Sequence, residues 1–230
     1  QAEAPPRVFL RRTTLTWRPG PLAGCVGFRK GGFARRTDGG LPRVATSILY
    51  WRRIDLPGLE RLGGTTGDEG CVAASTGIRL ADGGYRGDHR WRFDREWRVQ
   101  AVVVERWGPQ GRHGLRLERA EGGWCVDGTP RPDLDGAEEP DLSVTPFCNT
   151  LAIRRVPPDP GATRTLDVAY IDGLALTVAR SRQRYVRLGA GRLRYVDLGT
   201  AVGFEAEISV DDAGWVLQYP PLFERVTPGA

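Results

Sequence analysis

Residues 141–156, DLSVTPFCNTLAIRRV, are the one stretch of this 230-residue chain whose pattern favours a helix. Thr145 can cap the helix, because its hydroxyl oxygen can accept a hydrogen bond from a backbone N–H two or three residues later. Pro146 then occupies the first helical position, where its missing donor costs nothing. Val156 is followed by two prolines, which end the helix. The stretch therefore predicts one short helix of about three turns.

Apolar side chains lie around most of the circumference of this helix, so it needs cover on several sides. Asn149 and Arg155 fall among them on the helical wheel, and buried polar groups need hydrogen-bonding partners. One interpretation is that both side chains line an internal polar site. The other is that Asn149 bonds a loop carbonyl while Arg155, beyond the helix end, reaches solvent. The residue types leave both open.

Outside this stretch the chain reads as short strands between Gly- and Asp-rich turns, which is typical of an antiparallel meander. His89, Trp91 and Phe93 share one face of a strand. Residues 97–106 are apolar on both faces in the middle, which predicts a covered central strand that carries Trp97. We read residues 56–70 as a loop-rich connector and residues 215–219 as the last strand. The pattern predicts a mainly β domain over residues 46–230, with about ten or more strands.

The basic charge is concentrated at the N-terminal end. Residues 1–45 carry 9 basic and 2 acidic side chains, whereas residues 46–230 carry 24 basic and 26 acidic ones. A pI near 9.3 is therefore weak evidence for a nucleic-acid partner, and we expect no specific one. We expect residues 1–45 to be a poorly ordered Pro-, Gly- and Arg-rich extension. A tail that touches nucleic acid or anionic lipid, and sequence upstream of the true start, are alternatives.

The four cysteines, Cys25, Cys71, Cys125 and Cys148, show none of the spacings of zinc or redox sites, so we expect reduced thiols, no metal and no cofactor. No apolar run is long enough for a membrane span, and the N-terminal residues lack the apolar core of a signal peptide. These observations predict a cytoplasmic protein. The missing initiator Met indicates a fragment or a processed chain.

Motifs that would demand catalysis are missing. GAGRLRYVDLG lacks the third glycine of a dinucleotide fingerprint and leads into a strand, and no nucleophile elbow or phosphate loop occurs. We expect His89 and His113 to be strand or surface histidines, and the acidic pairs at 138–139 and 211–212 to be solvated turn residues. The sequence leaves enzymatic activity open and leans against it.

Several segments together resemble a bacterial family of glycolipid-binding proteins, formerly a domain of unknown function. They are YWRRID with PGLE, RWRFDREWR, DLSVTPFCNTLAIRRV, RYVRLGAGRLRYV and VDDAGWVLQYPPLFERV, between residues 47 and 226. The resemblance implies a large curved antiparallel sheet, a half-barrel or β-roll, wrapped around one short helix and distantly like the lipoprotein localisation factors. It also implies a tight homodimer and an acidic pocket between sheet and helix. We therefore expect a non-enzymatic binder or carrier of a glycolipid-like or other amphipathic ligand.

Eight residues match the family's motifs and have side chains suited to such a ligand. Carboxylates and amides bond sugar hydroxyls, and aromatic rings cover the C–H face of a sugar. The predicted ligand-binding residues are Asp94, Trp97, Asp141, Thr145, Asn149, Arg155, Tyr195 and Tyr219. Structural alternatives exist: Trp97 can be core, Tyr219 can fix the last strand, Asp94 can be solvated, and Asp141 can pair with Arg154 or Arg155. Phe147 replaces a smaller residue usual in the family, which bears on the pocket volume.

Two other functions stay open at this point. A carbohydrate- or lipid-processing enzyme would use two carboxylates, such as Asp94 and Asp141, as acid and base. Alternatively, the chain is a structural protein whose dimer surface is its function.

Overall fold

The computed structural model describes residues 47–67, 70–81 and 83–228, so the extension expected over residues 1–45 lies outside the described residues. In the described part, the chain forms one fifteen-stranded sheet, one short 3-10 helix and one α-helix. The strands are β1 (Ser47–Arg53), β2 (Gly58–Gly67), β3 (Gly70–Arg79), β4 (Tyr85–Phe93), β5 (Val99–Gly108), β6 (Gly111–Ala120), β7 (Gly123–Val126), β8 (Thr129–Pro130), β9 (Glu139–Leu142), β10 (Thr163–Asp172), β11 (Thr177–Gly189), β12 (Arg192–Asp197), β13 (Glu205–Val210), β14 (Val216–Tyr219) and β15 (Phe223–Arg225). The helices are η1 (Pro132–Leu134) and α1 (Phe147–Ile153).

The sheet is an open meander, with β8 at one edge and β9 at the other. Neighbouring strands follow chain order except at the centre, where β1 pairs with β15. All pairs are antiparallel apart from β9 and β10. Parallel neighbours need a long crossover connection, and the segment that holds α1 provides it.

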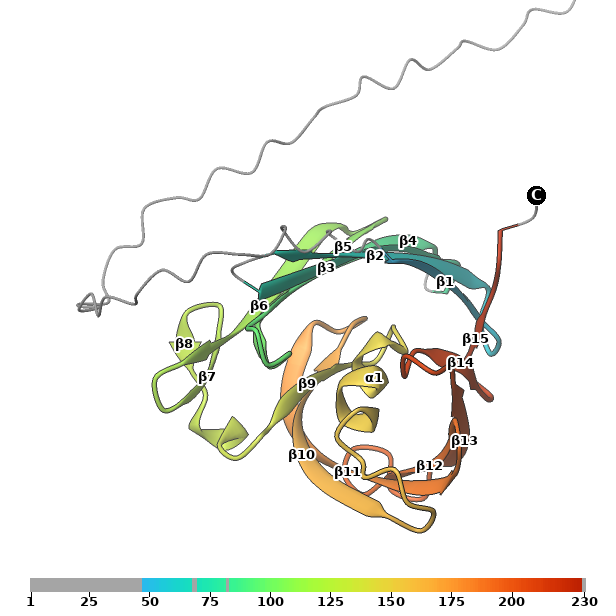
Figure 1. Cartoon of the computed structure of the whole chain (residues 1–230). Coiled ribbons are helices and arrows are strands. Elements are labelled where there is room, and N and C mark those ends of the chain that lie inside the picture. The colour runs from blue at the N-terminus through green and yellow to red at the C-terminus, as the bar shows by residue number, and fades with distance from the viewer. Residues whose placement is uncertain (1–46, 68–69, 82, 229–230) are drawn as a thin grey trace, which may run out of the picture. The chain divides into compact units, whose positions relative to one another are not determined.

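Two parts of the sheet surround the helix differently (Figure 1). Strands β1–β8, which we call the arch, curve over one side of α1. Strands β9–β15, which we call the roll, curl around the rest of it. The mainly β fold and the curved sheet around a single short helix are thereby confirmed.

Helix α1 has seven residues, so the prediction of about three turns was too long. The helix begins after Pro146, which is its N-cap, so the prediction that Thr145 is the cap and Pro146 the first helical residue was wrong by one position. The Thr145 hydroxyl does accept from the Phe147 N–H, at 3.2 Å, as predicted. Tighter turns that follow Ile153 carry the chain to Val156. All seven helical residues are buried, which agrees with the prediction of cover on several sides.

The apolar side chains of α1 are divided between two cores. Phe147 and Leu151 pack into the core that the arch shares with β9 and β10. Ile153, together with Val156 beyond the helix, packs into a separate core inside the roll. The helix therefore contributes to the cores of both parts, in addition to the β1–β15 pairing that joins arch and roll in one sheet.

Three local predictions were wrong. Residues 58–67, predicted as part of a connector, form a strand. The prediction failed because Glu60 and Leu62 point inward while Leu59 and Arg61 point outward, so the sequence does not show an apolar alternation. Trp97 lies before β5 in a turn with φ of 60°, so it is not on a strand face. The strand at residues 216–219 is not the last, since β15 follows the two prolines.

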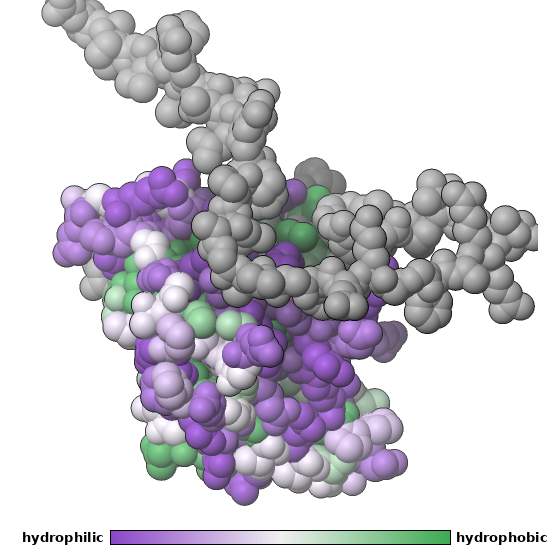
Figure 2. Space-filling view, turned by 90° about the vertical axis from the view of Figure 1, so that its left-hand side faces the viewer, coloured by the Kyte–Doolittle hydropathy of each residue, from purple (hydrophilic) through white to green (hydrophobic). Residues whose placement is uncertain are grey.

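The alternation predicted at the end of β4 is confirmed: His89, Trp91 and Phe93 are buried while Arg90 and Arg92 are exposed. The surface seen in Figure 2 is mainly hydrophilic, with apolar residues in small separate groups. Neither helix in the described ranges is long and apolar enough to cross a membrane.

Candidate functional site

The eight predicted residues do not form one site. One group, inside the roll, contains Asp141, Asn149, Tyr195 and Tyr219; the rest, Asp94, Trp97, Thr145 and Arg155, are held in other contacts.

The group inside the roll is built around the carboxylate of Asp141. It accepts hydrogen bonds from the thiol of Cys148, at 2.7 Å, and from the amide of Gln183. Tyr185 donates to the Gln183 carbonyl oxygen at 3.3 Å and accepts from the Asn149 amide at 2.9 Å. Asn149 therefore bonds a tyrosine hydroxyl inside the protein, as the internal-site interpretation requires.

Aromatic rings extend this group to a second carboxylate. Tyr185 meets Tyr195 edge-on at 5.3 Å, and Tyr195 meets Tyr219 at 5.8 Å between ring centroids. Tyr195 donates its hydroxyl proton to Asp197 at 3.1 Å. We call the whole set the inner acidic cluster: Asp141, Cys148, Asn149, Gln183, Tyr185, Tyr195, Asp197 and Tyr219.

The inner acidic cluster has no cation. Among the described residues, neither Asp141 nor Asp197 forms an ion pair. Burial raises the pKa of Asp141, and the charge of Asp197 adds to this, while hydrogen bonds from Cys148 and Gln183 oppose it. Burial also raises the pKa of Tyr185, so that hydroxyl stays a donor at neutral pH.

Asp197 has a clear structural role beside its contact with Tyr195. One carboxylate oxygen accepts from the backbone N–H groups of Gly199 and Ala201, at 2.8 and 3.0 Å. Asp197 thus closes the turn after β12 and has little capacity left for a ligand.

Thr145 belongs to a different buried group, inside the arch, which we call the Glu60 clamp: Glu60, Ser75, Arg79, His89 and Thr145. One oxygen of Glu60 accepts from Ser75 at 2.7 Å, Thr145 at 2.9 Å and His89 at 3.0 Å. The Nη2 of Arg79 lies 3.6 Å from the other oxygen. The clamp joins β2, β3 and β4 to the start of α1.

His89 is a neutral structural histidine in this clamp. Trp91 donates its indole N–H to Nδ1 of His89 at 2.7 Å, so the ring proton sits on Nε2 and is donated to Glu60. The prediction of a strand histidine is confirmed.

Arg155 pairs with Glu139 of β9 and donates to the carbonyl oxygen of Trp97 at 3.4 Å. The expectation that Glu139 is a solvated turn residue was wrong, because it is 3% exposed and also accepts from the Val99 N–H. Burial raises its pKa against the opposing charge of Arg155. The pair fastens the end of the α1 segment to the edge strand of the roll.

Asp94 and Trp97 shape the turn between β4 and β5. The Asp94 carboxylate accepts from the backbone of Glu96 and Arg98, at 3.0 and 2.9 Å. The indole of Trp97 packs against Phe93, and the guanidinium of Arg154 lies over it at 4.6 Å. The face of the Trp97 ring that was predicted to cover a sugar therefore contacts Arg154 of this chain.

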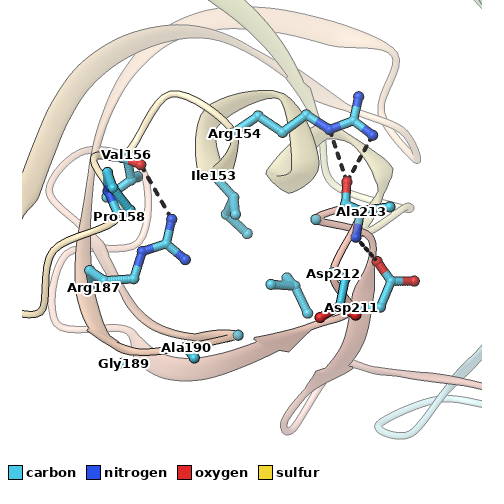
Figure 3. Close-up of a pocket in the computed structure, with 13 residues that line it drawn as sticks. Ile153, Arg154, Val156, Pro158, Arg187, Gly189, Ala190, Asp211, Asp212 and Ala213 are labelled. Atoms are coloured by element: carbon cyan, nitrogen blue, oxygen red, sulfur yellow. Dashed lines mark hydrogen bonds between the residues drawn. The ribbon is translucent and has the colours of Figure 1, made fainter.

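A cavity of about 550 Å³ lies elsewhere, at the open end of the roll (Figure 3). Ile153, Val156 and Val210 give it apolar surface, and the turns at 189–191 and 211–214 form much of its wall. The full lining is Ile153, Arg154, Val156, Pro158, Arg187, Gly189, Ala190, Gly191, Val210, Asp211, Asp212, Ala213 and Gly214. None of the eight predicted residues is among them. We call this space the mouth cavity.

The two acidic residues of the mouth cavity differ in their contacts. Asp211 accepts from the N–H groups of Ala213 and Trp215 and pairs with Arg225, so it is not simply solvated. Asp212 is exposed, as predicted. In the described ranges no group of three or more His, Cys, Asp or Glu side chains is placed to hold a metal ion, and the thiols of Cys125 and Cys148 are not in disulfides.

The fold and this cavity define a class of protein in which a curved sheet surrounds one helix and a partly apolar cavity lies beside the helix end. The model of a family described as "Putative glycolipid-binding" matches residues 48–225, and the chain belongs to that family. It is also similar to the crystal structure of a DUF1089 family protein from Pseudomonas aeruginosa, at 29% identity and a TM-score of 0.59. That match covers 84% of this chain and 100% of the other. No curated protein matches the sequence.

Proposed function

We propose that this protein binds, without chemical conversion, an amphipathic glycolipid-like molecule in the mouth cavity between α1 and the sheet. One observation carries the proposal: a space of about 550 Å³ combines apolar surface from Ile153, Val156 and Val210 with charged side chains on its walls. Cavities that bind small molecules have this size and this mixture. The family's description supports the glycolipid class.

The cavity suits a ligand with two kinds of surface. An alkyl chain would contact the cavity-facing edges of the three apolar side chains, which are 2–8% exposed, and the more exposed Pro158 and Ala190. The part of the chain that these residues cover would lose its contact with water, at about 25 cal/mol for each Å² buried. Hydroxyls of a sugar would reach Asp212 and the backbone of the glycine-containing turns.

The predicted acidic pocket corresponds in this proposal to the inner acidic cluster, whereas the aspartates of the mouth cavity lie among arginines. Strand β12 runs from beside the cavity, near Gly191, to Asp197 in the cluster. Asp141, Asn149, Tyr195 and Tyr219 remain our proposed contacts for a ligand that reaches further into the roll. Ligand binding by Asp94, Trp97, Thr145 and Arg155 stays a prediction, although each has a structural partner.

Gly189 offers a direct test of the site. A side chain there would meet open space, because no atom lies within 4 Å of a Cβ built on this residue and its φ is not left-handed. Gly189→Leu should therefore fill part of the mouth cavity and leave the fold intact. The matched control is Ala120→Leu, at an exposed position of β6 in the arch.

Calorimetric titration with alkyl glycosides and alkyl glucuronides, below their micelle concentrations, measures the effect. We expect binding by the wild type and the control, and at least about tenfold weaker binding by Gly189→Leu. If no such amphiphile binds the wild type, or the blocked variant binds as well, the proposal fails.

The enzyme alternative is less favoured by the contacts of its carboxylates. Asp94 is engaged by backbone N–H groups of its own turn. Asp197 is the other carboxylate whose charge acts on Asp141. It already accepts hydrogen bonds from two backbone amides and from Tyr195, which disfavours it as the second catalytic carboxylate.

The expected homodimer also remains a proposal. Ile48, Leu59, Val72 and Ile78, on the outer face of β1–β3, are each 47–49% exposed, and such an apolar sheet face suits a second copy. Light scattering at micromolar concentration should give twice the mass of the chain, and Ile78→Glu should lower it. If the wild-type protein is a monomer at this concentration, the proposed homodimer is wrong.

A further inference from the structure

We propose that the ligand of the mouth cavity has an acidic sugar head group, with a carboxylate or phosphate that faces Arg187. This inference rests on the proposed function and names the ligand class of the same site. It differs from the acidic pocket that the family resemblance implies, because an acidic pocket alone would repel such a head group.

Arg187 has hydrogen-bonding capacity that the protein does not use. Its guanidinium projects into the cavity (Figure 3). It makes two long contacts, from Nε to the carbonyl oxygen of Pro157 at 3.4 Å and from Nη2 to that of Val156 at 3.3 Å. A guanidinium has five N–H donors, so three remain for a ligand.

Arg187 also has no carboxylate partner among the described residues, although it is partly buried. Two other arginines of β11 do have a carboxylate partner: Arg180 and Arg182 both pair with Asp167. A partly buried cation without a counterion is unfavourable, and an anionic group in the cavity would supply that counterion.

A second arginine adds positive charge at the rim. Arg154 donates from Nε and Nη2 to the carbonyl oxygen of Ala213 and lies over the rings of Trp97 and Trp215, at 4.6 and 4.7 Å. These contacts fix its position without cancelling its charge.

The aspartates on the facing wall do not cancel both arginines. Arg225 pairs with Asp211, which leaves Asp212 as the aspartate of this wall that has no cation partner among the described residues. The three arginines 154, 187 and 225 against the two aspartates give a net charge of +1. A singly charged anion would balance it, and Asp212 can accept from hydroxyls on the same sugar.

Two probes that differ in one group test this inference: octyl glucoside and octyl glucuronide, which carries a carboxylate in place of a hydroxymethyl group. We expect the glucuronide to bind wild-type protein at least about tenfold more tightly, because charge-assisted hydrogen bonds are stronger than neutral ones. The preference should shrink at high ionic strength.

Arg187→Gln should abolish the preference by weakening glucuronide binding alone. Arg194→Gln, at an exposed position of β12 outside the cavity, is the matched control and should keep it. If octyl glucoside binds as tightly as the glucuronide, or if Arg187→Gln retains the preference, the acidic head group is overturned while the proposed function stands. If neither probe binds, both proposals fall.

Discussion

The arch and the roll each bury a carboxylate against α1, but they surround it differently. In the arch, three donors bond one oxygen of Glu60 and Arg79 lies near the other. In the roll, Asp141 has a thiol and an amide and no cation.

The pKa values of the two groups move in opposite directions. Burial alone would raise the pKa of Glu60, but the hydrogen bonds from His89 and Ser75 and the charge of Arg79 outweigh it, so the pKa is lowered. Burial dominates at Asp141, and its pKa is raised. The arch therefore provides its buried carboxylate with a cation and three donors, whereas the roll leaves the carboxylate of Asp141 without a cation.

The cavities beside the two parts of the sheet also differ, and the larger one belongs to the roll. The cavity beside the Glu60 clamp measures about 10 Å³, while the mouth cavity of the roll measures about 550 Å³. This comparison supports our proposals that the arch anchors α1 and that the roll binds the ligand.

The largest effect on stability should come from Glu60→Gln. It leaves Arg79 without its counterion, so we expect the free energy of unfolding to fall by about 3–5 kcal/mol in urea denaturation. The control Glu207→Gln breaks an ion pair with Arg192 in which the two side chains are 50% and 62% exposed, and it should change the free energy of unfolding far less than Glu60→Gln does. Equal effects would show that the clamp does not anchor the fold.

Thr145→Val should have a smaller effect of the same sign. It removes the hydrogen bond to Glu60 and the one from the Phe147 N–H, while it keeps the shape of the side chain. We expect a loss of about 2 kcal/mol in the same denaturation experiment. Thr177→Val, at an exposed position of β11 in the roll, should change stability by less than about 0.5 kcal/mol. A Thr145→Val protein as stable as the wild type would contradict the link between clamp and helix.

Asp141→Asn should act in the opposite direction. At pH values above the folded pKa of Asp141 it removes a buried charge without a cation, so we expect stability to rise there by about 1 kcal/mol. Thermal unfolding of the variant and the wild type measures this. A large loss would mean that the charge of Asp141 is required by the fold.

The pH dependence of that gain follows from the raised pKa. Below the ordinary carboxyl value of 3.8, Asp141 is protonated in both the folded and the unfolded chain, so the variant and the wild type should be about equally stable. As the pH rises from there through the folded pKa, the wild type should lose stability relative to Asp141→Asn. A gain that is the same at all pH values would contradict burial as the cause.

Gly189→Leu should have the smallest effect on stability, within about 0.5 kcal/mol, because the new side chain enters open space. A clearly destabilised variant would mean that the mouth cavity is not free to accept added atoms. Its loss of ligand binding would then be uninformative, and Ala190→Leu, at an exposed position of the same turn, would replace it.

The features that the sequence predicted depend on neighbours along the chain. The hydrogen bond of Thr145 with the start of α1 spans two residues, and the alternation of His89, Trp91 and Phe93 lies within one strand. Motif resemblance supplied the curvature of the sheet, which no local pattern encodes.

The missed features join distant segments or reverse the usual pattern. Glu60 was overlooked because it points inward from a strand whose Leu59 points outward, among glycines that read as a loop. The mouth cavity forms where the turns at 189–191 and 211–214 meet the end of α1. The glycines of these turns were the available signal, but only the order of the strands brings the turns together.

The most direct test of the account is a crystal structure of the protein grown with octyl glucuronide. We predict ligand density in the mouth cavity, with the alkyl chain against Ile153, Val156 and Val210 and the carboxylate within hydrogen-bonding distance of Arg187. Density on the arch, with the mouth cavity empty, would contradict the assignment of binding to the roll.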